Sequence, residues 1–183
     1  GTWIVAFTSG YNNVSPGDGN GHLFVLNAAT GALLDKIDTL ESGNPVGSTS
    51  APSGLAKINA WVESKLDNTA KRIYGGDLLG NLWRFDFDNN YDPTGKEAVK
   101  LAELRVGAIR QPITVKPELA RVKNLYDVVF VGTGRYLGVT DLANTEQQSI
   151  YALKDALGAT GLGSVRQGSQ LVQQTMTEST NAN

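Results

Sequence analysis

Residues 73–86 have the sequence IYGGDLLGNLWRFD, which indicates two short strands joined by a tight turn. The first strand ends in two glycines, and the second contains two aromatic residues. Asp77 and Asn81 flank the connection between them, where short polar side chains can accept hydrogen bonds from the backbone of a turn. We assign a structural role to six positions of this hairpin: Gly76, Asp77, Gly80, Asn81, Trp83 and Asp86.

The second strand of the hairpin is repeated. Three segments share the order small or polar, polar, aliphatic, aromatic, any, apolar, polar; they are GHLFVLN at 21–27, GNLWRFD at 80–86 and QSIYALK at 148–154. Each is preceded by an apolar run that contains glycine near its end, at 3–11, 72–77 and 127–136. Large aromatic residues recur within the copies, as packing between neighbouring sheets requires. They are Phe24, Trp83, Phe85 and Tyr151.

Two further strands complete each unit. An amphipathic strand is predicted after each hairpin, at 32–39, 98–106 and, less clearly, 171–177. A leading strand is predicted before the second and third hairpins, at 54–62 and 111–122. Four antiparallel strands per unit are typical of a propeller blade. The sequence therefore predicts an all-β, quinoprotein-like partial β-propeller of about three four-stranded antiparallel blades.

The repeat also predicts the domain organisation. We expect one propeller segment over 1–183, with a partial first blade at about 1–40, a second at about 54–106 and a third at about 111–177. The polar residues 178–183 are expected to form a flexible tail. Closure needs at least about four blades, so we expect a fragment of a larger propeller, with any export signal outside it.

The composition excludes several classes of function. A formal net charge of -2 with no basic run lacks the electrostatic pattern of a nucleic-acid binder. The absence of cysteine excludes disulfides, thiolate metal sites and cysteine nucleophiles. No apolar stretch approaches the roughly 20 residues of a bilayer helix. We predict no nucleic-acid partner and no membrane-spanning segment.

Candidates for catalysis are few. His22, the only histidine, is interpreted as a surface or turn residue. The glycine-rich stretches 17–21 and 132–138 are interpreted as turns and not as phosphate cradles, because no helical pattern follows either. The acidic stretch 86–92 lacks the turn glycine and closing glutamate of an EF-hand and favours a hairpin turn. We predict no catalytic and no cofactor-binding residue.

The hairpin block resembles the signature of the C-terminal β-propeller of PilY/PilC-type proteins, the type IV pilus assembly factors and tip adhesins. Residues 5–37 and 128–153 resemble two further blocks of that family, in the family's order. The segment LFVLNAATGALL at 23–34 is also similar to the blade strand of quinoprotein dehydrogenases and of outer-membrane assembly scaffolds. That similarity supports the fold and implies no quinone cofactor.

The resemblance implies a non-catalytic propeller segment that supports pilus assembly, adhesion and twitching motility. It implies export through the periplasm to the pilus tip and bacterial cell surface. Expected partners are pilin or minor pilins, other pilus machinery, and host-cell or abiotic surfaces. Loops 12–20 and 137–147 are the expected contact sites. A quinoprotein-type dehydrogenase fragment and a periplasmic outer-membrane-assembly scaffold remain alternatives.

Many members of this family carry a calcium loop just before the YGGD strand. The resemblance places its ligand positions on Glu63, Lys65, Asp67, Thr69 and Lys71. Two of these are lysines, which have no acceptor atom and repel a divalent cation. We therefore predict no cofactor, with calcium binding lost or weak at this loop.

Overall fold

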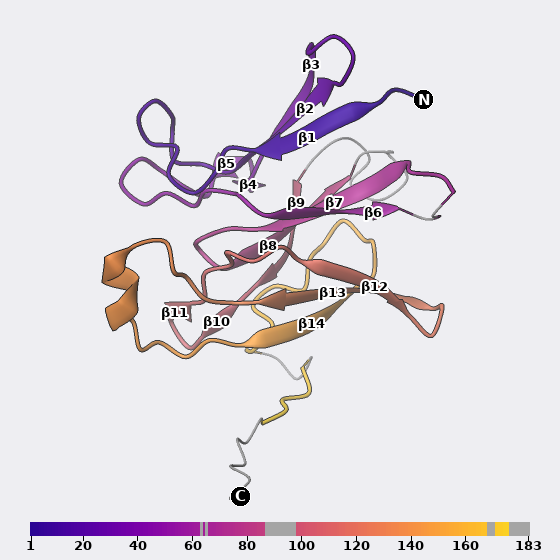
Figure 1. Cartoon of the computed structure of the whole chain (residues 1–183). Coiled ribbons are helices and arrows are strands. Elements are labelled where there is room, and N and C mark those ends of the chain that lie inside the picture. Colours follow the sequence, from indigo (N-terminus) through magenta and orange to yellow (C-terminus); the bar gives the residue numbers. More distant parts are fainter. Residues whose placement is uncertain (63, 65, 87–97, 168–170, 176–183) are drawn as a thin grey trace, which may run out of the picture.

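The computed structural model describes the chain except for residues 63, 65, 87–97, 168–170 and 176–183. The described residues form antiparallel sheets and one 3₁₀ helix, η1 (Val139–Ala143), and three of the sheets stack face to face (Figure 1). The first sheet contains β1 (Ile4–Thr8), β2 (His22–Asn27) and β3 (Leu33–Asp38). The second contains β6 (Ile58–Val62), β7 (Ala70–Gly76), β8 (Asn81–Asp86) and β9 (Ala98–Glu103). The third contains β12 (Glu118–Val122), β13 (Tyr126–Gly132) and β14 (Ile150–Asp155).

Two small ribbons connect the sheets. One pairs β4 (Leu40–Glu41) with β5 (Asn44–Pro45) between the first and second sheets. The other pairs β10 (Arg105–Val106) with β11 (Ile109–Arg110) between the second and third sheets. The three predicted hairpins are confirmed as β1–β2, β7–β8 and β13–β14, and every pair in the three large sheets is antiparallel.

The amphipathic strand expected at 171–177 is wrong over its described part, because residues 171–175 form no strand. Leu171 packs against the core while Val172 is exposed. The segment buries too little apolar surface to offset the entropy of ordering a strand. Residues 176 and 177, the tail at 178–183 and the turn expected after Asp86 lie outside the described residues.

Apolar side chains between the sheets form the core. One cluster lies between the first and second sheets and consists of Leu23, Ile37, Leu55, Ile73, Trp83 and Phe85. The other, which includes Tyr74, Leu82, Val129, Tyr151 and Leu153, lies between the second and third sheets. Because β8 has a sheet on each side, all of its residues are buried, whereas β14 alternates between buried and exposed.

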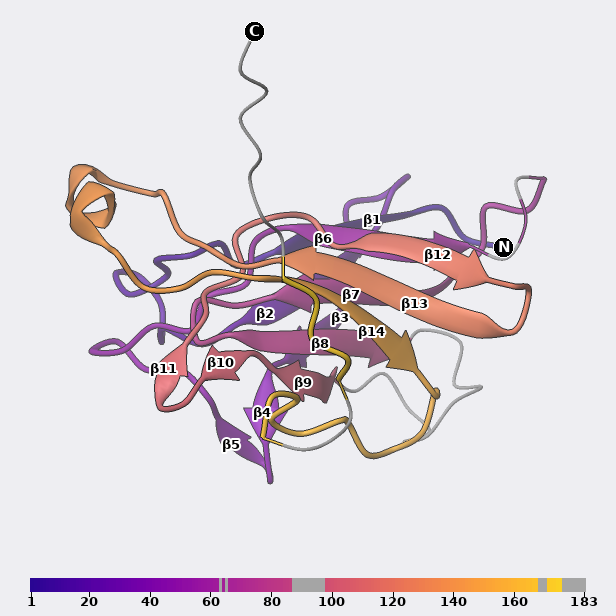
Figure 2. The same ribbon diagram turned by 90° about the horizontal axis from the view of Figure 1, so that it is seen from below.

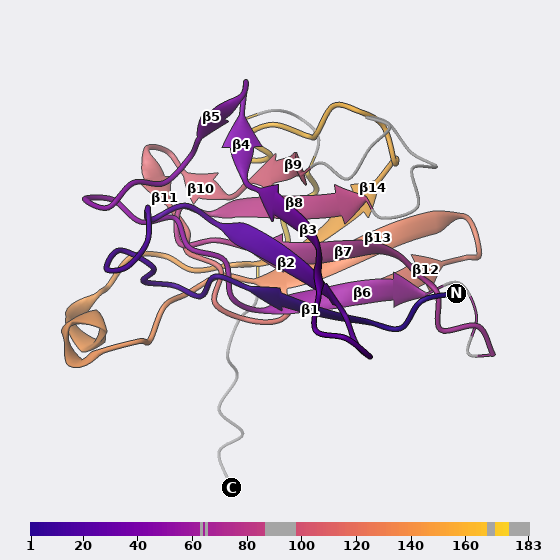
Figure 3. The same ribbon diagram turned by 90° about the horizontal axis from the view of Figure 1, so that it is seen from above.

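Hydrogen bonds join the first strand of each large sheet to the segment just before the first strand of the next large sheet. Thr8 Oγ1 donates a hydrogen bond of 2.8 Å to the carbonyl of Ala56, just before β6. Asn59 Nδ2 on β6 donates a hydrogen bond of 2.8 Å to the carbonyl of Pro117, just before β12. The β1–β2, β7–β8 and β13–β14 connections emerge at one end of the stack (Figures 1 and 3). We call this end the loop end.

Candidate functional site

Asp77 organises the tight turn of the central hairpin. Its Oδ1 accepts hydrogen bonds from the backbone N–H groups of Leu79 at 2.9 Å and Asn81 at 2.8 Å. Its Oδ2 accepts from Asn81 Nδ2 at 2.8 Å and Trp83 Nε1 at 2.9 Å. Burial raises the pKa of Asp77 to about 6, while these hydrogen bonds act in the opposite direction. The carboxylate is occupied by the turn itself, which supports a structural role.

The glycines of the hairpin allow close packing around this turn. A Cβ on Gly76 would lie 2.2 Å from Ile113 Cγ2. Gly80 has a φ of +79°, and a Cβ there would lie 2.5 Å from the carbonyl oxygen of Leu104. Asp86 is buried at the end of β8. The six motif positions therefore lie in or beside the packed centre of the stack and not on its surface.

A buried polar network between the second and third sheets was not predicted from the sequence. Arg84 Nη1 lies 2.7 Å from Asp155 Oδ1, and Arg72 Nη2 pairs with Asp127. Tyr74 OH donates a hydrogen bond of 2.7 Å to Asp155 Oδ2, and burial raises the pKa of this phenol. The available signal was the presence of arginine in strands that are otherwise largely apolar. A charge inside such a strand needs a buried partner.

The interpretation of His22 as a surface or turn residue is wrong, because its side chain is buried. Nδ1 lies 2.6 Å from Asp38 Oδ1, and Nε2 lies 2.9 Å from Asp18 Oδ1. Loop 12–20 folds back so that Asp18 reaches the ring from outside the sheet. The backbone hydrogen bond from Asn20, followed by the hydrogen bond from His22, lowers the pKa of Asp18 despite partial desolvation. These contacts hold loop 12–20 against the start of β2 and the end of β3.

Three of the five calcium-loop positions, Asp67, Thr69 and Lys71, lie among the residues that the structure describes. Glu63 and Lys65 lie outside the described residues. Asp67 Oδ1 accepts hydrogen bonds from the backbone N–H and the hydroxyl of Thr69, and these bonds lower the pKa of Asp67. Lys71 supplies no acceptor atom. The described residues include no group of three or more histidine or carboxylate side chains placed to hold a metal ion. Weak or absent calcium binding stays a prediction.

The two long loops at the loop end differ in how closely they contact the rest of the chain. In loop 12–20, Asn20 Oδ1 accepts hydrogen bonds from Thr39 Oγ1 at 3.0 Å and from the N–H of Gly47 at 3.3 Å. This loop is thereby held against its neighbours. The loop that contains η1 extends away from the sheets instead (Figures 1 and 2).

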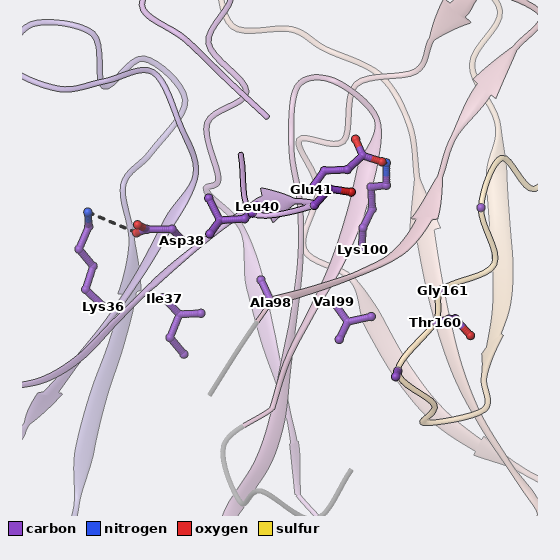
Figure 4. A pocket seen from close by; sticks show the side chains of 14 residues that line it. Lys36, Ile37, Asp38, Leu40, Glu41, Ala98, Val99, Lys100, Thr160 and Gly161 are labelled. Atoms are coloured by element: carbon purple, nitrogen blue, oxygen red, sulfur yellow. Dashed lines mark hydrogen bonds and ion pairs between the residues drawn. The ribbon is translucent and has the colours of Figure 1, made fainter. Parts of the chain in front are cut away.

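An open groove of about 840 Å³ lies between β3, β4 and β9 (Figure 4). Its charged side chains are paired with one another. Lys36 Nζ lies 3.3 Å from Asp38 Oδ1, and Lys100 Nζ pairs with Glu41. Because neighbouring opposite charges cancel, the groove does not present several groups of one sign to a common point.

The stack of one four-stranded and two three-stranded antiparallel sheets defines this chain as a β-propeller segment. Comparison with known proteins agrees. The chain belongs to the family described as the PilY1 beta-propeller domain, which it matches over residues 1–183.

Several relatives are similar to this chain in sequence. A type IV pilus biogenesis factor PilY1 homolog of Xylella fastidiosa is 35% identical over 159 residues, covering 85% of this chain and 11% of the relative. A second homolog from that organism is 28% identical over 184 residues, covering 94% and 12%. The type IV pilus biogenesis factor PilY1 of Pseudomonas aeruginosa is 28% identical over 179 residues, covering 85% and 14%. The chain thus spans a small part of each relative.

The fold is shared with a solved structure. The crystal structure of the Pseudomonas aeruginosa PilY1 C-terminal domain aligns with a TM-score of 0.69 at 24% identity, covering 89% of this chain and 37% of that one. This confirms the all-β propeller prediction. Among the residues that the structure describes, no helix has the length and apolar character needed to cross a bilayer.

Proposed function

We propose that this chain is a non-catalytic propeller segment of a type IV pilus biogenesis factor that supports pilus assembly, adhesion and twitching motility. Its relatives are named as pilus biogenesis factors, which supports the first part of the proposal. The observation that carries the non-catalytic part is the state of the described titratable groups. Asp77, His22 and the Arg84–Asp155 pair all serve internal contacts.

The proposed partners are pilin or minor pilins and other pilus machinery, together with host-cell or abiotic surfaces in adhesion. The proposed location is the pilus tip or cell surface, reached through the periplasm. A rigid stack of sheets that holds a long loop at one end suits such contacts, because recognition is usually carried by loops on a rigid scaffold.

Deletion of the full-length gene tests this function. We expect loss of surface pili, of twitching and of surface attachment, with recovery when the intact gene is returned. A deletion strain with normal piliation, twitching and adhesion would refute the proposal. Dye-linked oxidation of alcohols or sugars by the purified full-length protein would refute its non-catalytic part.

A further inference from the structure

The loop after β13 contains a turn that its own hydrogen bonds hold in shape. We call residues 135–143 the finger. Asp141 Oδ1 accepts a hydrogen bond of 2.8 Å from Arg135 Nε, and Oδ2 accepts from the N–H groups of Leu137 at 2.8 Å and Gly138 at 3.2 Å. The Asp141 side chain is only 6% exposed although the finger is at the surface. The finger is therefore ordered by its own contacts before any partner binds.

The ordered finger displays apolar side chains to solvent. Tyr136 is 71% exposed, Val139 82% and Leu142 69%, and none of the residues of η1 is buried. Because these three apolar side chains are exposed, their burial does not stabilise the turn. Ordered, exposed aromatic and aliphatic groups close together in sequence are typical of a protein-binding site.

The position of the finger separates it from the contacts between blades. It projects past the ends of the strands at the loop end (Figures 1, 2 and 3). A further blade would pack on the outward face of the third sheet, where Phe130 and Ile150 lie. Such a blade covers a sheet face and not the space beyond the strand ends. The strands of a blade stacked on this face would therefore leave the finger uncovered.

The charge of the finger indicates the kind of partner. Arg135 and Asp141 are the only charged residues in 135–143, and they pair with each other. The finger therefore lacks the group of cations that attracts a protein segment to anionic lipid. Its one carboxylate accepts hydrogen bonds within the turn and is not available as an acceptor for sugar hydroxyls. An uncharged apolar groove on another protein fits these properties best.

We propose that the finger docks the propeller into an apolar groove of a pilus subunit, a pilin or minor pilin. This partner rests on the proposed function, while the docking element rests on the geometry of the finger. Tyr136, Val139 and Leu142 enter the groove, and Asp141 acts as a positioning residue that keeps the turn in its binding shape.

Binding of the full-length protein to purified pilins and minor pilins of the same organism tests the proposal. The double variant Tyr136→Ser/Leu142→Ser is expected to weaken binding on the order of a hundredfold, because buried aromatic and aliphatic anchors carry most of an interface's affinity. The matched control is Leu125→Ser, a 72% exposed leucine in the turn between β12 and β13, at the end of the third sheet away from the β13–β14 connection. It is expected to leave the affinity unchanged.

A photo-crosslinking amino acid at position 139 gives a second measurement that does not depend on the folding of the double variant. A covalent adduct with a pilin or minor pilin is expected. Wild-type affinity of the double variant, or crosslinks only to lipid or to the protein's own chain, would overturn the docking proposal while leaving pilus assembly intact as a function. Normal piliation of the gene-deletion strain would refute the proposed function instead.

Discussion

Replacement of Asp77 by alanine should destabilise the propeller by removing the carboxylate that holds the central hairpin turn. Three of the N–H groups bonded to Asp77 are in fully buried contacts, namely the backbone and side-chain N–H of Asn81 and the indole N–H of Trp83. Each unsatisfied buried donor costs about 1–3 kcal/mol. The gross cost is therefore about 3–9 kcal/mol.

Part of this cost is offset because the substitution also removes a buried charge. The pKa of Asp77 is raised from 3.8 to about 6, which corresponds to a penalty of about 3 kcal/mol on the charged form. We expect a net loss of about 3 kcal/mol near neutral pH.

The loss should grow as the pH falls. Because the folded pKa is the higher one, the folded state takes up a proton between about pH 6 and pH 4, and the stability linked to Asp77 increases over that range. Alanine cannot take up this proton. The difference in the free energy of unfolding between wild type and Asp77→Ala should therefore rise by about 2 kcal/mol from pH 7 to pH 4.5.

Urea unfolding of the full-length protein at the two pH values, followed by tryptophan fluorescence, measures both effects. The control is Glu118→Ala, which removes an exposed carboxylate and should change stability by at most about 0.5 kcal/mol. An Asp77→Ala midpoint equal to wild type, or a difference that shrinks toward low pH, would show that the carboxylate does not hold the turn as described.

Gly76→Ala should cost about 1–3 kcal/mol by overpacking, whereas Gly132→Ala, whose added Cβ would have no neighbour closer than 3.8 Å, should be nearly neutral; equal melting temperatures for the two variants would contradict the packing argument. Asp155→Ala should cost about 3–5 kcal/mol by leaving Arg84 buried without this carboxylate, and an unchanged urea midpoint would refute a stabilising role for the pair. Titration with terbium or calcium should give no micromolar binding at the degenerate loop; micromolar affinity that is lost in Asp67→Ala would show that the site is functional.

The hairpins could be predicted because their signals are local. In the central hairpin, a glycine-ended strand, a short turn and an aromatic strand lie within the 14 residues 73–86, and the same order of strands occurs in the other two hairpins with longer connections. The contacts that fix the candidate sites are not local. Arg72 and Asp127 are 55 residues apart in sequence, and Arg84 and Asp155 are 71 residues apart. Their pairing depends on how the sheets stack, which a strand pattern does not encode.

The burial of His22 also could not be predicted from the strand pattern, although its partners Asp18 and Asp38 are closer in sequence. The sequence places it correctly at the start of a strand, but its exposure depends on the path of loop 12–20. That path places the Asp18 carboxylate 2.9 Å from Nε2 of His22, so the side chain at the start of the strand is buried. Residue type and spacing predicted the strand, whereas the conformation of loop 12–20 determined the burial of His22.

The aromatic position of the repeat is buried in two of the three large sheets and lies on an outward face in the other. Trp83 is fully buried because the first sheet covers its face of β8, and Tyr151 is buried against the second sheet. Phe24 holds the same position in the first repeat, but it lies on the outward face and stacks on Phe7 at a ring-centroid distance of 5.2 Å. Because this position is buried wherever a sheet precedes it, the exposed Phe7–Phe24 face is suited to covering by another sheet of a larger propeller. The finger is different in kind, since it lies beyond the strand ends and not on either outer face of the stack (Figures 2 and 3).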